Sequence, residues 1–295
     1  MVKSLPRPCP ICQVDAPVAY EEKIDPALIS EFTFASRKRP ELMHYEYREC
    51  HKCRLLFASQ QPGTGDLLTA YHDAAFDSAL ESSFAARTYV GALGKFFRPG
   101  MDVLDVGCGD GTFLLECLRA GASSVRGIEP SPSAVDFAEP QVRDRIFIGG
   151  HENFDEAEQY DLITLFQTVE HIRDPQSFFR DMRKFGRPGG YIAVACHDYR
   201  SPVNRVLGAK SPIFDIEHLQ VYSKTSIGKA MEVAGLDVMR VGAYANTYPL
   251  SYWMRLAPIP ERMKEASAIR NGFIGRIPLK LRVGNLMAVG QFPSA

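Results

Sequence analysis

Long apolar stretches are missing from this sequence. No window approaches the roughly 20 uninterrupted apolar residues that a membrane-spanning helix requires. The N-terminal segment MVKSLPRPCPIC also lacks the apolar run of a signal peptide. We therefore expect a chain with no membrane span that works in the cytoplasm.

An excess of charge of one sign is missing as well. The 295 residues include 34 lysines and arginines against 35 aspartates and glutamates, which gives a net charge of -1. Such a chain has no general basic field to attract a nucleic-acid backbone, so RNA or DNA binding would need a local patch. Arg37-Lys38-Arg39 is only a short basic cluster. The composition argues against a nucleic-acid partner.

A disulfide framework is a third absence, because the chain has seven cysteines, an odd number with uneven spacing. Reduced thiols are the simpler interpretation. The sequence is 45% hydrophobic, which supplies a sizeable core without disulfide bonds. At roughly 150 residues per domain, the length suggests two domains or one large domain with an appendage.

Four of the cysteines form two CxxC pairs, Cys9 with Cys12 and Cys50 with Cys53. Four thiolates complete the tetrahedral shell of a structural zinc site. The 37 residues between the pairs exceed the usual zinc-ribbon spacing, which implies an insertion. Four unrelated thiols, a redox CxxC or a ligand role for His51 are the weaker alternatives. We predict a structural Zn2+ held by these cysteines.

The pattern of apolar residues divides the chain into three zones. Residues 1–60 hold the paired cysteines and form the predicted zinc ribbon, and residues 61–98 show helical periodicity that ends at Pro99-Gly100. From residue 99 to 295, short apolar strands alternate with helical runs, which is typical of βαβ units and a parallel sheet. The predicted strands are MDVLDVG, SSVRGIE, RIFIG, YDLITLF and GGYIAVA, followed by strands near 238–243 and 286–290.

A glycine-rich turn follows the first of these strands. Gly107, Gly109 and Gly111 stand at alternate positions where the strand passes into a helix, which permits close approach of a nucleotide-like ligand. Asp105 and Asp110 flank this turn, and two carboxylates favour a cationic ligand over a pyrophosphate. Glu129 ends the second strand, where an acid accepts hydrogen bonds from ribose hydroxyls. A tight βα connection without a ligand is the alternative.

Residues 85 to 245 resemble the class I S-adenosylmethionine-dependent methyltransferases. The resemblance rests on VLDVGCGDGTF, GIEPSPSAVDFA, YDLITLFQTVEHIRDP and FGRPGGYIAVA. It implies an α/β, Rossmann-like sheet of seven strands with the last strand antiparallel. It also implies that Asp105, Gly107 and Gly109 contact the methionyl part of the cofactor and Glu129 its ribose. Gln167 either faces the methionyl end or merely terminates its strand.

A hydroxyl acceptor needs a base to remove its proton during methyl transfer. His171 and its neighbour Glu170 follow the fourth predicted strand, and His218 lies in a later loop beside Glu217. We expect His171 to be the base ahead of His218, with Glu170 orienting it or contacting substrate. His197 is a further candidate. Structural hydrogen bonds are an equal alternative for His171 and His218.

An aromatic and basic insertion covers about residues 244–282 of the methyltransferase zone. Its rings and cations either stack on a sugar and contact a phosphate, pack as a lid, or join two copies of the chain in a homodimer. Its members are Tyr244, Tyr248, Pro249, Tyr252, Trp253, Arg255, Pro258, Pro260, Arg262, Lys264, Arg270 and Arg276.

The sequence predicts an S-adenosylmethionine-dependent methyltransferase with a structural zinc ribbon. The ribbon resembles the one that precedes some bacterial methyltransferases of sugars and polysaccharide precursors, which favours a hydroxyl on a sugar, nucleotide-linked sugar or related small metabolite. Two alternatives stand beside this prediction. One is an RNA methyltransferase that grips nucleic acid with the ribbon, and the other is a cofactor-binding scaffold without catalysis.

Overall fold

A seven-stranded sheet is the centre of the protein, seen in a computed structural model that describes residues 6–25, 27, 42–60, 69, 72, 79–256 and 273–294. The strand order is β10-β13-β8-β7-β4-β5-β6. The strands are β4 (Asp102–Val106), β5 (Ser124–Glu129), β6 (Ile146–Ile148), β7 (Tyr160–Phe166), β8 (Gly186–His197), β10 (Asp237–Ala243) and β13 (Asn285–Gln291). All seven fall on strands predicted from the sequence.

The direction of these strands confirms the predicted fold class. Neighbouring strands from β6 to β8 pair in parallel, whereas β13 is antiparallel to both β8 and β10. A parallel sheet is built from βαβ units, so its strands all end at one edge, which we call the carboxyl edge. The β13 strand runs the other way and therefore begins at that edge, with Asn285 opposite His197.

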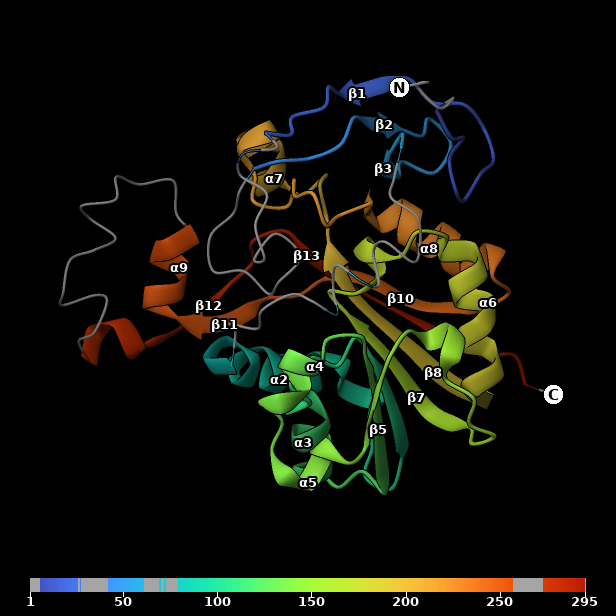
Figure 1. Cartoon of the computed structure of the whole chain (residues 1–295), viewed down its shortest axis with the longest axis vertical. Helices are drawn as coiled ribbons and strands as arrows, with labels where there is room; N and C mark the ends of the chain where they lie inside the picture. The colour runs from blue at the N-terminus through green and yellow to red at the C-terminus, as the bar shows by residue number, and fades with distance from the viewer. Residues whose placement is uncertain are drawn as a thin grey trace.

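Helices cover both faces of the sheet (Figure 1). On one side lie α2 (Ala79–Leu93), α3 (Thr112–Arg119), α4 (Pro132–Asp136) and α5 (Pro140–Arg143), and on the other α6 (Pro175–Phe185) and α8 (Lys224–Val233). The start of α6 is the predicted one, because the Asp174 carboxylate accepts from the N–H of Gln176 and Ser177 ahead of Pro175. Gly235, at φ 75°, follows the end of α8 as expected.

Alternating side chains divide the core into two layers. Along β4, Val103 packs with the side that holds Leu93 and Leu114, whereas Leu104 packs with the side that holds Phe178. Successive side chains of a strand point to opposite faces, so a sheet covered on both sides needs apolar residues at every position. This explains the continuous apolar runs at residues 192–196 of β8 and 286–289 of β13.

A second, four-stranded sheet joins the N-terminal region to the rest of the chain. Its strands are β1 (Val18–Tyr20), β2 (Tyr47–Glu49), β3 (Leu56–Ala58) and β9 (Gln220–Val221), in that order and all antiparallel. Because β9 comes from a distant part of the sequence, the ribbon region and the α/β region share one sheet. The domain limits at residues 60 and 98 stay predictions.

The C-terminal insertion contains a two-stranded sheet of β11 (Asn246–Pro249) and β12 (Pro278–Leu281), with α9 (Leu250–Leu256) after β11. Trp253 Nε1 donates to the Leu279 carbonyl oxygen at 3.0 Å, and the Tyr248 and Tyr252 rings pack 4.2 Å apart. These aromatic residues therefore pack within the insertion itself. Pro258, Pro260, Arg262, Lys264 and Arg270 lie outside the described residues, as do Arg37 to Arg39 and most of residues 61–78.

Short elements complete the chain, namely α7 (Pro202–Leu207) and the 3-10 turns η2 (Gly94–Phe96), η3 (His151–Asn153), η4 (Val169–His171), η5 (Gly208–Lys210) and η6 (Phe273–Arg276). Within the described part of the chain, no helix combines the length and the apolar character needed to cross a membrane.

Candidate functional site

The glycine-rich turn after β4 lies at the carboxyl edge. Gly107, Gly109 and Gly111 all have positive φ angles, of 77°, 54° and 68°, which other residues adopt at a cost. A Cβ atom on Gly107 would lie 2.5 Å from Thr168 Oγ1, so this turn packs directly on the turn after β7. Thr168 Oγ1 donates in turn to the Val106 carbonyl oxygen at 2.9 Å. Only glycine fits at position 107.

Glu129 fixes the same turn from the end of β5. Its Oε2 accepts from the Gly109 N–H at 2.8 Å and its Oε1 from the Ser131 N–H at 2.9 Å. Burial raises the pKa of the Glu129 carboxyl to about 7, against the effect of these two hydrogen bonds. Each carboxylate oxygen can accept a second hydrogen bond. Glu129 is therefore placed to receive hydroxyl donors without releasing the turn.

Asp105 lies beneath the turn. It is only 3% exposed, and its Oδ1 accepts from Thr164 Oγ1 at 2.6 Å, across the β4–β7 pairing. Burial raises the pKa of the Asp105 carboxyl to about 7, with the charge of Glu129 as a smaller cause in the same direction. The structure thus gives Asp105 a partner inside the sheet.

Asp110 is the third buried acid at this turn, and its Oδ1 accepts from the Thr112 N–H at 3.0 Å. Burial raises the pKa of the Asp110 carboxyl as well. Buried carboxylates that lack cations are costly to ionise, so a ligand with positive charge is favoured here. The ammonium and sulfonium of S-adenosylmethionine fit this charge, and its ribose fits the acceptor oxygens of Glu129.

Unpaired buried oxygens gather at the carboxyl edge. In the described part of the chain, six buried side-chain oxygens lack a hydrogen-bond partner, and four of them belong to Gln167, Glu170, Tyr244 and Asn285. These residues follow β7, follow β10 or begin β13. Folded proteins leave few such atoms unpaired, because each costs about 1–3 kcal/mol. Their grouping marks this edge as a place where a ligand supplies the missing donors.

Gln167 is the clearest member of this group. It adopts a positive φ of 58°, rare for a residue with a side chain, and its N–H donates to the Ala195 carbonyl oxygen at 2.8 Å. Backbone strain of this kind is typical of functional sites. The geometry is consistent with the predicted position of Gln167 at the cofactor.

A group of histidines surrounds Glu170 beside this turn. Glu170 is fully buried, and its Oε1 accepts from both the N–H and Nδ1 of His197, at 2.8 and 3.0 Å. The His218 ring lies 5.1 Å from the His171 ring and 5.3 Å from the His197 ring, between centroids. We call His171, His197 and His218 the histidine cluster.

The structure gives Glu170 a different partner from the expected one. Glu170 and His171 are successive residues of the 3-10 turn η4, in which neighbouring side chains point about 120° apart. Glu170 therefore reaches His197 on the adjacent strand. His171 instead has its Nδ1 3.6 Å from Glu217 Oε2.

Charge and burial act in opposite directions on Glu170. Burial alone would raise the pKa of this carboxyl, but the hydrogen bond from His197 and the charges of the three histidines lower it below its ordinary value. Glu170 is thus an ionised carboxylate in the core.

His218 is held in one tautomer. Its Nδ1 lies 2.7 Å from the Ile213 carbonyl oxygen, which only a protonated Nδ1 satisfies. Burial lowers the pKa of His218, and the charge of His197 lowers it further. His218 is therefore a neutral imidazole with Nε2 as its basic nitrogen.

The loop after β6 carries His151. The His151 ring packs 4.6 Å from the Phe178 ring, and its Nε2 lies 3.8 Å from Asp181 Oδ2. Both partners belong to α6, so His151 ties this loop to the helix layer.

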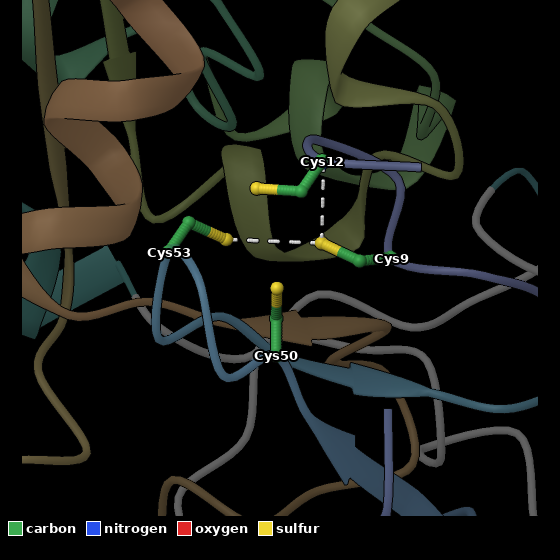
Figure 2. A group of neighbouring side chains, drawn as sticks. All are labelled: Cys9, Cys12, Cys50 and Cys53. Atoms are coloured by element: carbon green, nitrogen blue, oxygen red, sulfur yellow. Dashed lines mark hydrogen bonds between the residues drawn. The ribbon is translucent and has the colours of Figure 1, made fainter. Parts of the chain in front are cut away.

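The four cysteines of the two CxxC pairs converge (Figure 2). Their sulfur atoms all lie within 4.8 Å of one another, and the Cys9 and Cys53 sulfurs are 3.7 Å apart. Zinc–sulfur bonds of about 2.3 Å in a tetrahedron place sulfurs about 3.8 Å apart. The hydrogen bond from Cys53 lowers the pKa of the Cys9 thiol to about 5, whereas the same contact raises the pKa of Cys53 and burial raises that of Cys12 to about 11. The donor set and its dimensions fit Zn2+.

The two CxxC turns have the same backbone geometry. After each second cysteine comes a residue with positive φ, Gln13 at 53° and Arg54 at 60°. The N–H of each donates to the carbonyl oxygen of the first cysteine, at 2.8 and 2.9 Å. Two matched turns that present four sulfurs are typical of a zinc ribbon.

Tyr47 links this region to the histidine cluster, a contact that the sequence does not reveal. The fully buried Tyr47 hydroxyl donates to the carbonyl oxygens of His218, at 2.5 Å, and Asp215, at 3.2 Å. Tyr47 and His218 are 171 residues apart in sequence. No local pattern marks such a pair.

Comparison with known proteins agrees with this geometry. Residues 80–241 match the family described as Methyltransferase domain. A Ubiquinone biosynthesis O-methyltransferase of Rhizobium etli is 30% identical over 185 residues, which cover 55% of this chain and 71% of that protein. A tRNA U34 carboxymethyltransferase of Idiomarina loihiensis is 34% identical over 104 residues, 32% of each chain. The crystal structure of a SAM dependent methyltransferase from Aquifex aeolicus matches with a TM-score of 0.45 and 16% identity, over 78% of this chain and all of that one.

The sheet order, the glycine-rich turn and the acid at the end of β5 define an S-adenosylmethionine-dependent methyltransferase of class I. The match over residues 80–241 covers more than half of the sequence. The chain belongs to the methyltransferase domain family.

Proposed function

We propose that this methyltransferase transfers a methyl group to a hydroxyl of a small metabolite, with His218 as the base. The observation that carries this proposal is the histidine cluster around the ionised Glu170, at the same sheet edge as the glycine-rich turn. When bound, S-adenosylmethionine supplies an electrophilic methyl group. Glu129 and the turn after β4 hold its ribose and methionyl parts, and Gln167 lies at the methionyl end.

The base removes the hydroxyl proton while the new bond to the methyl carbon forms and the bond from that carbon to sulfur breaks. His218 suits this role because its Nδ1 is occupied by the Ile213 carbonyl oxygen, which leaves Nε2 to take the proton. Glu170, through His197, places a negative charge close to the imidazolium that results. This order of candidates reverses the sequence prediction, in which His171 came first.

An O-methyltransferase among the relatives supports a hydroxyl acceptor. The ribbon supports a sugar or nucleotide-linked sugar, by its resemblance to the ribbons of sugar-modifying methyltransferases. The RNA alternative is supported by the tRNA-modifying relative, but the balanced charge of the chain argues against it.

We further propose that the four cysteines bind a structural Zn2+ and that the enzyme is cytoplasmic. Four protein thiolates fill a tetrahedral shell and leave no position for substrate. None of the seven cysteines forms a disulfide, which is the state expected in a reducing compartment.

The test combines cofactor binding and turnover. Calorimetric titration with S-adenosylhomocysteine should show binding to the zinc-loaded protein that is lost in Glu129→Ala. Methyl transfer from labelled S-adenosylmethionine to a panel of sugars, sugar phosphates and nucleotide-linked sugars should be lost in His218→Ala, with cofactor affinity unchanged. Transfer to RNA only, or normal turnover in His218→Ala, would overturn the proposal. His171→Ala tests the second candidate in the same assay.

A further inference from the structure

We propose that a basic pocket beside the histidine cluster binds a phosphate group of the acceptor, which makes the substrate a phosphorylated sugar or related phosphate ester. This inference rests on the proposed function and specifies its substrate class. The pocket has a volume of about 480 Å³, within the usual range of small-molecule sites. It lies where β8 and β10 end, β13 begins and α8 starts.

Three cationic side chains are among the residues that line the pocket. Arg200 follows β8, Lys224 is the first residue of α8, and Arg282 follows β12, so three separate segments each supply one cation. Asp198 is the single carboxylate among the described lining residues. Cations from several segments at one cavity match a multiply charged anion, because phosphate oxygens accept several charge-assisted hydrogen bonds.

Arg200 and Asp198 already contact other groups of the protein. Arg200 Nη1 lies 3.1 Å from Glu49 Oε1 of the ribbon region, and Asp198 Oδ1 accepts from the Arg200 N–H at 3.0 Å. These contacts fix the Arg200 segment against the ribbon. Lys224 interacts with the charge of Asp198 at the same pocket, and Lys224 and Arg282 are the main candidates for the phosphate contacts.

The start of α8 adds a favourable dipole. This ten-residue helix is capped by Ser223, whose Oγ accepts from the Ser226 N–H at 3.1 Å, and Ser223 and Thr225 line the pocket. The N-terminal end of a helix carries partial positive charge and stabilises anions.

Asn285 provides an independent sign of a ligand. It lines the pocket, is only 7% exposed, and its Oδ1 has no hydrogen-bond partner. A buried amide oxygen without a donor is costly, and a hydroxyl of the ligand would satisfy it. A phosphorylated sugar carries both groups, a phosphate that can contact the cations and hydroxyls that can donate to Asn285 Oδ1.

The pocket adjoins the methyl-transfer site. Asn285 is paired directly with His197 of the histidine cluster, and Asp198 of the pocket follows His197, the last residue of β8. Neighbouring strands lie about 4.8 Å apart, so the two sites are close enough for one ligand to occupy both.

The experiment measures phosphate binding to the full, zinc-loaded chain saturated with S-adenosylhomocysteine. The probes are glucose 1-phosphate, UDP-glucose and unphosphorylated glucose, titrated by calorimetry. The test variant is Lys224→Gln with Arg282→Gln, and the control is Lys229→Gln, which removes an exposed cation of the same helix outside the pocket.

We expect both phosphorylated probes to bind more tightly than glucose and to lose about 10- to 100-fold in affinity in the double variant, as for charge-assisted hydrogen bonds. Lys229→Gln should bind like the wild type. Tighter binding of UDP-glucose than of glucose 1-phosphate would identify a nucleotide-linked acceptor, and equal binding a simple sugar phosphate.

Equal phosphate affinity in the double variant and the control, with cofactor binding intact, would overturn the pocket assignment alone. Failure of S-adenosylhomocysteine to bind, with phosphate binding retained, would instead overturn the proposed function. The two failures are therefore distinguishable in one set of titrations.

Discussion

The buried carboxyl of Glu129 makes a quantitative prediction about cofactor binding and pH. Ribose hydroxyls donate to a carboxylate, so the bound state needs Glu129 ionised. In the free protein burial raises its pKa to about 7 from the ordinary 4.5, a shift equivalent to about 3 kcal/mol. At pH 6 about nine-tenths of the free protein carries a protonated Glu129, and binding must expel that proton. The dissociation constant of S-adenosylhomocysteine should therefore be about tenfold higher at pH 6 than at pH 8.

Calorimetry in buffers with different ionisation enthalpies measures the number of protons released when S-adenosylhomocysteine binds. About one proton should be released on binding at pH 6 and almost none at pH 8. In Glu129→Gln the pH dependence from this group should vanish, and affinity should fall about 10²- to 10⁴-fold for two lost charge-assisted hydrogen bonds. Asp105 also has a pKa near 7 and stays in place in this variant, so the difference between the wild type and Glu129→Gln isolates the contribution of Glu129 from that of Asp105.

The same carboxyl affects the stability of the free protein, with a definite sign. Its pKa is higher folded than unfolded, so the folded state binds more protons between pH 4.5 and 7. The free energy of unfolding should gain up to about 3 kcal/mol from this group as pH falls through that window, and Glu129→Gln should remove that gain.

Cofactor affinity that is constant from pH 6 to 8, with no proton release on binding, would refute the reasoning about Glu129.

Three further predictions concern the ribbon and the base. Cys50→Ser should release zinc, measured as metal per chain by atomic emission, and a full complement of zinc would contradict the four-thiolate site. Tyr47→Phe should remove the hydroxyl donor of the His218 carbonyl oxygen, whereas the Asp215 carbonyl oxygen keeps the His218 N–H at 3.0 Å. We expect the free energy of unfolding to fall by about 1–3 kcal/mol and kcat to fall at constant zinc content. Tyr20→Phe, in the same aromatic cluster, is the control. His218→Asn should lower kcat about 10²- to 10⁴-fold with unchanged cofactor affinity, and a larger effect in His171→Asn would move the base to that residue.

The sequence was sufficient for the elements whose signals are local. The seven strands of the main sheet follow from apolar runs between turn residues, and α6 begins where the Asp174-Pro175 cap predicts. The position of Glu129 at the end of β5 was also predictable, because the βα turn and the next strand end lie at a fixed sequence spacing.

Contacts between distant segments were not predictable in this way. Glu170 pairs with His197 because η4 and the end of β8 are neighbours at the carboxyl edge, 27 residues apart in sequence. The two-residue strand β9 is too short for any periodicity, yet it completes the ribbon sheet. Such contacts depend on how complete elements pack.

The proposed cofactor side and the proposed acceptor side of the site depend on different parts of the chain. The cofactor side is built from β4, β5 and their turns, within residues 80–241, the range that matches the methyltransferase domain family. The proposed acceptor side also contacts the ribbon region, outside that range. The Arg54 carbonyl oxygen, in the second CxxC turn, accepts from the hydroxyls of Tyr199, at 3.1 Å, and Ser223, at 2.9 Å.

Arg7 strengthens the same connection. Its guanidinium donates to carbonyl oxygens of Ala58 in β3, Arg173 after η4 and Leu219 beside β9, at 2.8, 3.1 and 3.4 Å. The segments fixed in this way carry the histidine cluster and one wall of the basic pocket. A metal that orders the ribbon would therefore order the acceptor site without touching the substrate. Removing zinc should then impair kcat and phosphate affinity more than affinity for S-adenosylhomocysteine, and an equal loss of all three would indicate general unfolding.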